Sequence, residues 1–201
     1  ARARTRARVW DLAGGPPAAR VADRILEKDL VVLDVDATIV VAHSEKENAA
    51  ATFKHTFGFH PLLAFLDRPD IAGGEALGGL LRPGNAGSNT AADHVQVLDM
   101  ALASIPAHAR PTPGDPGGPR VLARSDSAGA TRAFAAACRE RGVGFSFGFP
   151  VDFRIKKFVY GIPEQCWYPA IDTDNAIRDG AWIAEATANI DTVSEGLIQQ
   201  A

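Results

Sequence analysis

Apolar residues follow a strand-like pattern in the first half of the chain. Leu30 to Val35 is a nearly continuous apolar run rich in β-branched residues, which predicts a buried strand. Phe59 to Leu66 and Ala76 to Leu81 are two further candidate strands. The segment from Asp67 to Gly74 contains Pro69 and two glycines and suits a reversal of direction between them. Three consecutive strands with short links favour an antiparallel meander.

A helical spacing follows the third strand. Apolar residues from Ala91 to Ile105 recur in steps of four and three, which marks one helical face, and Ser88 and Asn89 offer an N-cap before it. The Pro- and Gly-rich stretch from Pro106 to Pro119 suits neither a helix nor a strand ladder. We therefore predict a solvated loop there.

A strand, a helix and a strand are predicted after this loop. Arg120 to Ala123 is a short strand that ends at Ser125-Asp126, a helix from about Thr131 to Arg141 is stopped by Gly142, and Val143 to Phe149 is the last strand. A strand–helix–strand unit favours parallel pairing. The complete order predicts an α/β protein of the RNase H-like fold class: a mixed sheet, made of a three-strand antiparallel meander plus parallel strands and flanked by helices.

Breaks in composition divide the chain into three regions. Residues 1–28 are rich in Arg and Ala, are interrupted by Gly14-Gly15-Pro16-Pro17, and include a short predicted helix from Ala18 to Glu27. Residues 29–150 hold the predicted sheet, and residues 151–201 form a third region. No internal repeat is visible.

Composition excludes several classes of protein. The 201 residues, 46% of them hydrophobic, suit one domain or a domain plus an appendage. No apolar run reaches the roughly 18 residues of a transmembrane helix, so no membrane partner is expected. Cys138 and Cys166 are too few for a disulfide scaffold or a Cys-based zinc site, and a reduced cytoplasmic protein is the default. The net charge of −3 argues against a generic nucleic-acid coat protein, although it leaves room for a local basic groove. The chain opens with Ala1 rather than Met, which hints at a piece of a longer protein.

Three aspartates are the candidates for chemistry. Asp34 and Asp36 share one face of the first predicted strand, where repulsion and desolvation would penalise two carboxylates unless a divalent cation neutralises them. Asp126 follows a strand and precedes a helix, and on an adjacent strand it would complete a two-carboxylate site with Asp36. Such oxygen ligands suit Mg²⁺. In the alternative interpretation, the strand ends near Asp34, both acids are solvated, and Asp126 is a helix cap.

The segment from Asp34 to Ile39 also fits the DxDxT signature of haloacid dehalogenase-like phosphatases. In that alternative Asp34 would be the nucleophile and Asp36 the general acid, with Mg²⁺ beside them. That fold requires a parallel doubly wound sheet, whereas two strand-like runs with a tight reversal come next here. Its late acidic pair is poorly matched by Asp172 and Asp174.

Basic residues cluster shortly after the Asp-bearing strand. Lys46, Lys54 and His55 lie in this cluster with His43, and they could contact a phosphate backbone or be merely solvated. The five histidines form no zinc-type pair at helical spacing, and each favours a structural or surface role; they are His43, His55, His60, His94 and His108.

Long sequence strings resemble the DDE-type transposases of bacterial insertion sequences, and more narrowly the group numbered thirteen-eighty. The similarity extends to about Asn189. The strings that carry it are Leu33-Asp34-Val35-Asp36-Ala37-Thr38-Ile39-Val40, Ala42-His43-Ser44-Glu45-Lys46-Glu47, Phe53-Lys54-His55-Thr56-Phe57-Gly58-Phe59-His60-Pro61-Leu62, Leu81-Arg82-Pro83-Gly84-Asn85-Ala86-Gly87-Ser88-Asn89-Thr90, Arg124-Ser125-Asp126-Ser127-Ala128-Gly129-Ala130, Ile162-Pro163-Glu164-Gln165 and Arg178-Asp179-Gly180-Ala181-Trp182-Ile183-Ala184-Glu185.

The resemblance implies an RNase H-like catalytic core, in residues 29–150, that binds two divalent ions (Mg²⁺ or Mn²⁺) through an Asp–Asp–Glu triad. It implies cleavage at the element's DNA ends and joining of the freed 3′-hydroxyls to target DNA, in a nucleoid-associated protein that could be a homodimer. Asp36 matches the first catalytic Asp and Asp126 the second, with Asp34 as a further metal candidate. Arg82, Asn85 and Asn89 match family positions near the active face and join Lys46, Lys54 and His55 as expected DNA contacts.

The resemblance also places the catalytic Glu on a helix beyond an inserted β-rich region. Residues 151–201 correspond to the start of the inserted region, and Glu185 lies in the matched segment ahead of the rest of that region, so Glu185 is not assigned as the third ligand. We therefore expect a truncated transposase fragment with little or no strand-transfer activity. A DNA-binding remnant without catalysis is the non-enzymatic alternative.

Overall fold

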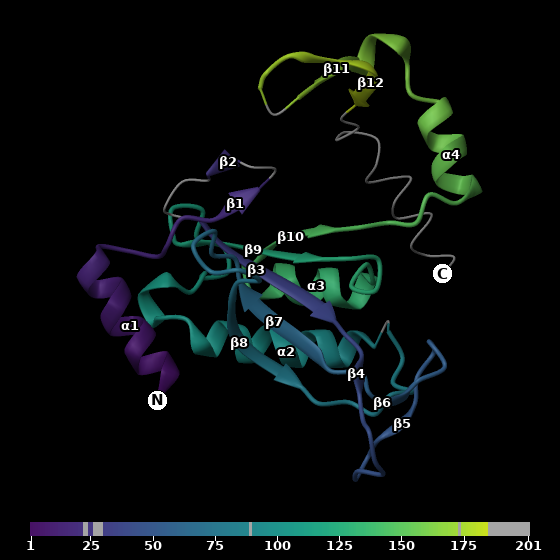
Figure 1. Ribbon diagram of the computed structural model, residues 1–201. Coiled ribbons are helices and arrows are strands. Elements are labelled where there is room, and N and C mark those ends of the chain that lie inside the picture. The colour runs from purple at the N-terminus through teal and green to yellow at the C-terminus, as the bar shows by residue number, and fades with distance from the viewer. Residues whose placement is uncertain (22–23, 26–29, 89, 173, 185–201) are drawn as a thin grey trace. The chain divides into compact units, whose positions relative to one another are not determined.

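The computed structural model describes residues 1–21, 24–25, 30–88, 90–172 and 174–184. The chain divides into two compact units, Ala1–Phe149 and Pro150–Ala201, which are described separately. The ribbon of both units is drawn in Figure 1. Within the described residues, no helix is both long enough and apolar enough to cross a membrane.

A five-stranded mixed sheet forms the centre of the first unit (Figure 1). Its strands are, in spatial order, β10 (Gly144–Phe147), β9 (Arg120–Ser125), β3 (Leu30–Ala37), β7 (Leu62–Leu66) and β8 (Glu75–Leu80). The pairs β3–β7 and β7–β8 are antiparallel, whereas β3–β9 and β9–β10 are parallel. This arrangement confirms the predicted RNase H-like mixed sheet, with its antiparallel meander and its two parallel strands.

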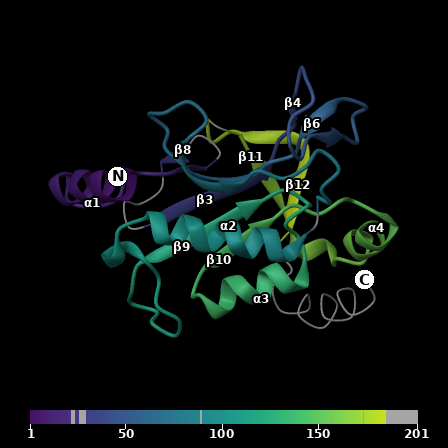
Figure 2. The same cartoon turned by 90° about the horizontal axis from the view of Figure 1, so that it is seen from below.

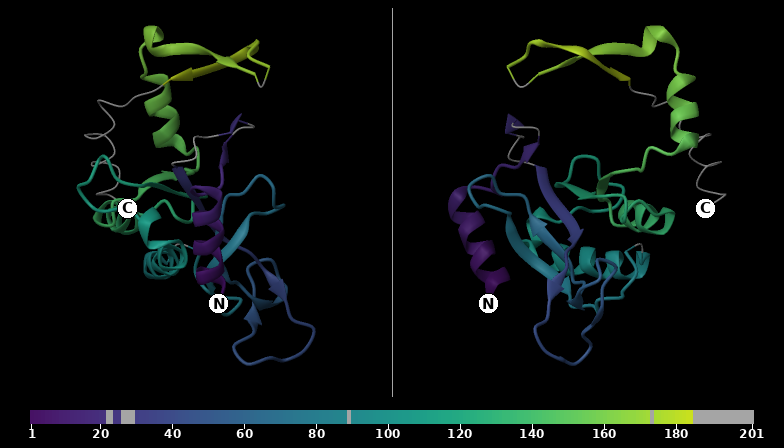
Figure 3. Two further views of the ribbon diagram at one scale, coloured as in Figure 1. Left: turned by 90° about the vertical axis from the view of Figure 1, so that its left-hand side faces the viewer. Right: turned by 45° about the vertical axis from the view of Figure 1, so that its right-hand side comes forward.

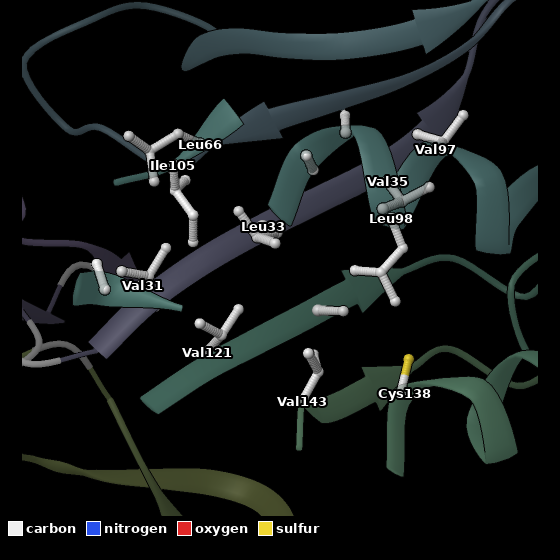
Figure 4. Packing of buried hydrophobic residues seen from close by; sticks show 14 of the residues in the cluster. Val31, Leu33, Val35, Leu66, Val97, Leu98, Ile105, Val121, Cys138 and Val143 are labelled. Atoms are coloured by element: carbon white, nitrogen blue, oxygen red, sulfur yellow. The ribbon is translucent and has the colours of Figure 1, made fainter. Parts of the chain in front are cut away.

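Two helices cover one face of this sheet. They are α2 (Ala91–Ser104) and α3 (Arg132–Glu140), which lie side by side below the strands in Figure 2. Alternate residues of β3 point toward them, and Figure 4 shows these side chains packed against the helices. The buried apolar residues of this layer include Val31, Leu33, Val35, Ala64, Leu66, Val97, Leu98, Val121, Ala123 and Phe134. Burial of this apolar layer is the main source of stability for the unit.

The structure confirms the predicted ends of α3 and corrects the predicted N-cap of α2. Thr131 caps α3, since its side chain accepts a hydrogen bond from the Phe134 N–H at 3.2 Å. Gly142, just beyond α3, has a φ of 69°, the left-handed conformation that glycine adopts most easily. The N-cap residue of α2 is Thr90, without a side-chain cap bond, rather than Ser88 or Asn89. Asn89 lies outside the described residues.

The N-terminal region differs from the prediction. A helix, α1, spans Arg2–Ala13, and the predicted helix from Ala18 to Glu27 is wrong at the positions described. There β1 (Arg20–Val21) and β2 (Arg24–Ile25) pair antiparallel, which satisfies their backbone groups across the pair. The β-branched Val and Ile of these pairs suit extended backbone better than a helix.

Helix α1 is anchored through two buried side chains one turn apart. Trp10 joins the apolar core. The guanidinium of Arg6 donates to Glu75 Oε1 at 2.6 and 2.9 Å and to the Ser104 carbonyl at 2.6 Å. An arginine-rich helix is therefore held against β8 and the end of α2, a contact that its own sequence pattern does not reveal.

The segment that connects β3 to β7 in the sequence forms a small three-stranded sheet. Its strands are β4 (Val40–Val41), β6 (Phe57–Phe59) and β5 (Ala50–Ala51), in that spatial order. We name residues 38–60 the arm, which extends away from the main sheet in Figure 3. The predicted strand from Phe59 to Leu66 is thus divided between two sheets. Pro61 lies at the division, where its missing N–H cannot contribute to a ladder.

The second unit contains one α-helix, one short 3₁₀ helix (Glu164–Cys166) and one hairpin in its described part. The helix α4 spans Phe153–Tyr160, and β11 (Trp167–Ile171) pairs antiparallel with β12 (Ile177–Ala184). Because the first unit holds all the predicted site residues that the structure describes, the site is built from that unit alone.

Candidate functional site

Two aspartates follow the last paired residues of neighbouring parallel strands. The β3–β9 ladder ends with Val35 opposite Ser125, and the next residue of each strand is Asp36 and Asp126. Parallel strands bring their carboxyl ends to the same edge of a sheet, where α/β proteins commonly bind ligands. Both aspartates are exposed. The ladder therefore brings two solvent-accessible carboxylates to one edge of the sheet.

Each of the two carboxylates is oriented by a nearby backbone N–H. Asp36 Oδ1 accepts from the Ala37 N–H at 2.8 Å, and Asp126 Oδ1 accepts from the Ala128 N–H at 2.9 Å. The Gly129 N–H in turn donates to the Asp126 carbonyl at 3.2 Å. A carboxylate has about four lone-pair sites, so most of this capacity is left for a cation.

Asp34 is held in an ion pair two residues before Asp36. Arg124 donates from Nε to Asp34 Oδ1 at 2.6 Å and from Nη2 to Asp34 Oδ2 at 2.7 Å. Both residues occupy the same register position of the β3–β9 ladder. A bidentate pair of this kind is strong and geometrically specific. The structure thus gives Asp34 a partner on the protein itself, and its contact with a metal stays a prediction.

Arg124 also lies 3.5 Å from Asp67 Oδ2, measured from Nη2. The hydrogen bond with Asp34 is the largest influence on the Arg124 guanidinium and raises its pKa; burial opposes the rise, and the charges of Asp34 and Asp67 add to it. The guanidinium consequently stays protonated at any ordinary pH. A permanent positive charge therefore lies on this face, two residues before the edge carboxylates.

The donor set at the edge suits a hard divalent cation. Mg²⁺ is commonly bound through one or two carboxylates, with water and substrate phosphates as the remaining ligands. Asp36 and Asp126 supply two carboxylates of this type. In the part of the chain that the structure describes, no group of three or more His, Cys, Asp or Glu residues could hold a metal.

Four of the residues predicted to contact DNA are exposed. Lys46, Lys54 and His55 lie on the arm, which begins two residues after Asp36, and Asn85 lies in the loop that follows β8. The arm and this loop are in close contact, because a Cβ on Gly84 would collide with backbone atoms of the arm. The fold thus brings these four residues to two adjoining segments.

Arg82 has a different environment. It is only 5% exposed, and its guanidinium donates to the His60 carbonyl at 2.9 Å, to the Gly87 carbonyl at 3.1 Å and to Asp93 Oδ2 at 3.0 Å. These bonds join the arm, the loop after β8 and the first turn of α2. Arg82 therefore has a structural role here in place of the predicted DNA contact, and Asn89 lies outside the described residues.

Two buried polar atoms near Asp126 were not singled out by sequence reasoning. His94 on α2 is 1% exposed, and its Nε2 has no hydrogen-bond partner among the described residues. Ser125 Oγ, at the end of β9, is likewise buried without a partner there. No sequence signal could have paired them, because a helix face and a strand end meet only in the folded chain.

The topology argues against the phosphatase alternative. A haloacid dehalogenase-like fold needs a parallel doubly wound sheet, whereas β7 runs antiparallel to both of its neighbours. In addition, both oxygens of Asp34, the nucleophile of that alternative, accept hydrogen bonds from Arg124. The mixed sheet, with Asp36 and Asp126 at one edge, instead has the layout expected of a DDE-type catalytic domain.

The family comparison agrees with this class. The family described as Transposase DDE domain group 1 matches residues 17–189, which is most of the chain. The chain therefore belongs to this transposase family, a family of enzymes that act on DNA and generally use divalent metal ions.

Comparison with solved structures finds a similarity to a cryo-EM structure of the simian T-cell lymphotropic virus intasome in complex with PP2A regulatory subunit B56 gamma. The two chains are 15% identical, with a TM-score of 0.33 over 67% of this chain. The matched part spans 38% of the other chain, well under two thirds of its length. Among curated proteins, none matches the chain.

Proposed function

We propose that this chain supplies the first two metal-binding carboxylates, Asp36 and Asp126, of a DNA transposase of bacterial insertion sequences in the group numbered thirteen-eighty. The observation that supports the proposal is the β3–β9 ladder, which ends one residue before each of these aspartates. The activity we propose for the intact protein is cleavage at the element's DNA ends and joining of the freed 3′-hydroxyls to target DNA.

In this proposal the carboxylates of Asp36 and Asp126 hold Mg²⁺ or Mn²⁺. When bound, a pair of such ions supplies activation of a water or 3′-hydroxyl and stabilisation of the leaving oxygen. The chain's own residues prepare the edge for this charge. The N–H groups of Ala37 and Ala128 orient the two carboxylates, and Arg124 neutralises Asp34 behind them.

The exposed polar side chains of the arm and the adjoining loop are the proposed DNA contacts. Lys46 and Lys54 would pair with phosphates, while His55 and Asn85 would donate hydrogen bonds to the backbone. Glu45 and Glu47 lie beside Lys46, so the arm carries no large net charge. We therefore propose a few positioned phosphate contacts rather than a broad basic surface, in a nucleoid-associated protein that could act as a homodimer.

The first experiment measures Mn²⁺ binding by the full chain from the electron paramagnetic resonance signal of free Mn²⁺. Asp36→Asn and Asp126→Asn are each expected to weaken binding at least tenfold, because each removes a charged ligand. Asp11→Asn, an exposed aspartate of α1, is the matched control and should bind as the wild type does. Binding that is the same in all four proteins would contradict the proposed site.

A DNA assay separates the catalytic from the non-catalytic alternative. Mg²⁺-dependent nicking of the element's end sequences that is lost in Asp126→Asn supports catalysis by these residues. Binding to DNA in a gel shift without any nicking would favour the DNA-binding remnant. The expectation of weak strand transfer by the chain as given stays a prediction, and robust strand transfer would contradict it.

The arm is tested by the salt dependence of DNA binding. Each phosphate contact contributes a slope of about −0.9 to the dependence of log K on log salt concentration for duplex DNA. Lys46→Gln and Lys54→Gln should each reduce the slope by about one. Lys156→Gln, in α4, is a control of equal charge change, and an equal reduction in that variant would count against a role specific to the arm.

A further inference from the structure

The strand end that carries Asp126 contains an unsatisfied polar group. Ser125 Oγ is buried and has no hydrogen-bond partner among the described residues. The same holds for His94 Nε2, on α2. Each buried donor or acceptor left unpaired costs about 1–3 kcal/mol, so two at one place call for an explanation.

The two groups adjoin the same glycine. A Cβ on Gly129 would collide with Ser125 Oγ and would lie 3.6 Å from His94 Cδ2, the ring atom bonded to Nε2. The missing side chain at this position therefore leaves Ser125 Oγ and the Nε2 edge of His94 beside one backbone position. Any larger residue at position 129 would displace Ser125 or the turn itself.

The chemistry of His94 makes it a suitable partner for a hydroxyl. Its Nδ1 lies 3.0 Å from the Thr90 carbonyl oxygen, and its ring lies against Phe134 with centroids 5.2 Å apart. A carbonyl can only accept, so Nδ1 carries the proton in this bond. In the neutral ring Nε2 is then an acceptor, and the Ser125 hydroxyl is a donor that rotates to suit.

We propose that His94 and Ser125 are positioning residues for Asp126: the Ser125 hydroxyl is joined to His94 Nε2 through one bridging water molecule, and this link holds the turn of residues 125–129. The inference rests on the proposed metal site. Ser125 immediately precedes Asp126, its carbonyl accepts from the Gly148 N–H at 3.0 Å, and it closes the ladder opposite Val35. A shift of Ser125 is therefore passed directly to the Asp126 carboxylate.

The test measures Mn²⁺ binding by the full chain in variants of the two residues. Ser125→Ala removes the hydroxyl, and His94→Asn can keep the bond to Thr90 while it loses the atom at the Nε2 position. Each should raise the dissociation constant for Mn²⁺ about tenfold, the usual effect of a lost outer contact to a metal ligand. His94→Gln places an amide near the Nε2 position and should bind within about threefold of the wild type.

Ser104→Ala is the matched control. Its hydroxyl, at the other end of α2, donates to the Leu77 carbonyl at 3.0 Å, so the variant loses stability without any change at Asp126. A purely structural role predicts the same pattern for Ser125→Ala: a lower melting temperature and an unchanged dissociation constant. That result would overturn the inference, and Ser125→Ala decides the matter alone if the His94 variants fail to fold.

Failure of the metal site and failure of the positioning role give different results in these variants. If Asp126→Asn weakens Mn²⁺ binding and Ser125→Ala does not, the metal site stands and the positioning role is wrong. If Asp126→Asn binds Mn²⁺ as well as the wild type does, the proposed function fails and the positioning role fails with it. Tenfold weaker binding in Ser125→Ala and His94→Asn, with recovery in His94→Gln, supports both.

Discussion

The two faces of the central sheet are made from the same strands and yet differ in chemistry at the end of β3 that carries the aspartates. On the face covered by α2 and α3, β3 presents Val31, Leu33 and Val35, all buried. On the other face the same strand presents Val32, which is also fully buried, followed by Asp34 and Asp36. Because side chains alternate along a strand, neighbouring residues can serve stability and chemistry separately. The face covered by the helices supplies the large apolar cluster, and the other face, open at Asp36, carries the ion pair and the edge carboxylates.

The largest effect on stability is expected for a substitution on the face that α2 and α3 cover. Leu33 is fully buried between the sheet and the helices, so Leu33→Ala removes apolar contacts and leaves a cavity. We expect the free energy of unfolding in urea to fall by about 2–5 kcal/mol. A loss below about 1 kcal/mol would mean that the helices are not tightly packed on this face.

The ion pair on the open face should have an intermediate effect. Asp34→Ala removes the carboxylate that takes two charged hydrogen bonds from Arg124. The pair is only partly buried, so we expect a loss of about 1–2 kcal/mol in the same urea measurement. A double-mutant cycle with Arg124→Met isolates the pair, and a coupling energy near zero would contradict the assigned role of Asp34.

Cys138 lies on α3 within the core, and it tests whether water reaches the apolar layer between the sheet and the helices. Burial raises the pKa of its thiol to about 11 from an ordinary value of 9.0, and the nearby Arg141 partly opposes the rise. The unfolded chain therefore releases this proton first as the pH rises, and folding stability falls between about pH 9 and pH 11.

The measurement compares Cys138 with Cys138→Ala in a Cys166→Ala background, so that one thiol titrates. The stability difference between the two proteins should shift by about 1 kcal/mol against the cysteine form between pH 8 and pH 10. A constant difference across this range would mean that water reaches the thiol.

The smallest effect on stability is expected at Asp36, one residue beyond the core position Val35. Asp36→Asn removes charge from an exposed side chain, and the free energy of unfolding should change by less than about 0.5 kcal/mol. Urea unfolding checks this, alongside the expected loss of Mn²⁺ binding. A stability loss as large as that of Leu33→Ala would remove the distinction between the faces.

Much of the main sheet follows from local pattern. The apolar run of β3 and the strand–helix–strand unit of β9, α3 and β10 have clear periodicity and recognisable ends, and the structure confirms them. The helix α1 has no such signal, because its burial depends on Arg6 meeting Glu75 and on Trp10 meeting the core. The division of the predicted strand at Pro61 depends on which partner strands reach each half.

The same limit applies to the candidate site. The sequence places Asp36 and Asp126 at strand ends, and their ladder positions follow once β3 and β9 pair. The sequence does not reveal that Arg82 is buried, since arginine is usually exposed. Its burial is offset by hydrogen bonds to three acceptors that only the fold brings together. Nor does the sequence reveal that Arg124 forms an ion pair with Asp34, because the two residues are 90 positions apart.

That separation has a consequence for how the protein is made. The antiparallel contacts of β3 with β7 span a few tens of residues and can form early, whereas the parallel contacts of β3 with β9 must close a loop of about ninety. Long-range pairing of this kind is slow and comes late in folding. A nascent chain that has not yet emerged past Asp126 would therefore hold only one of the two edge carboxylates, so ion binding would await nearly complete synthesis of the first unit.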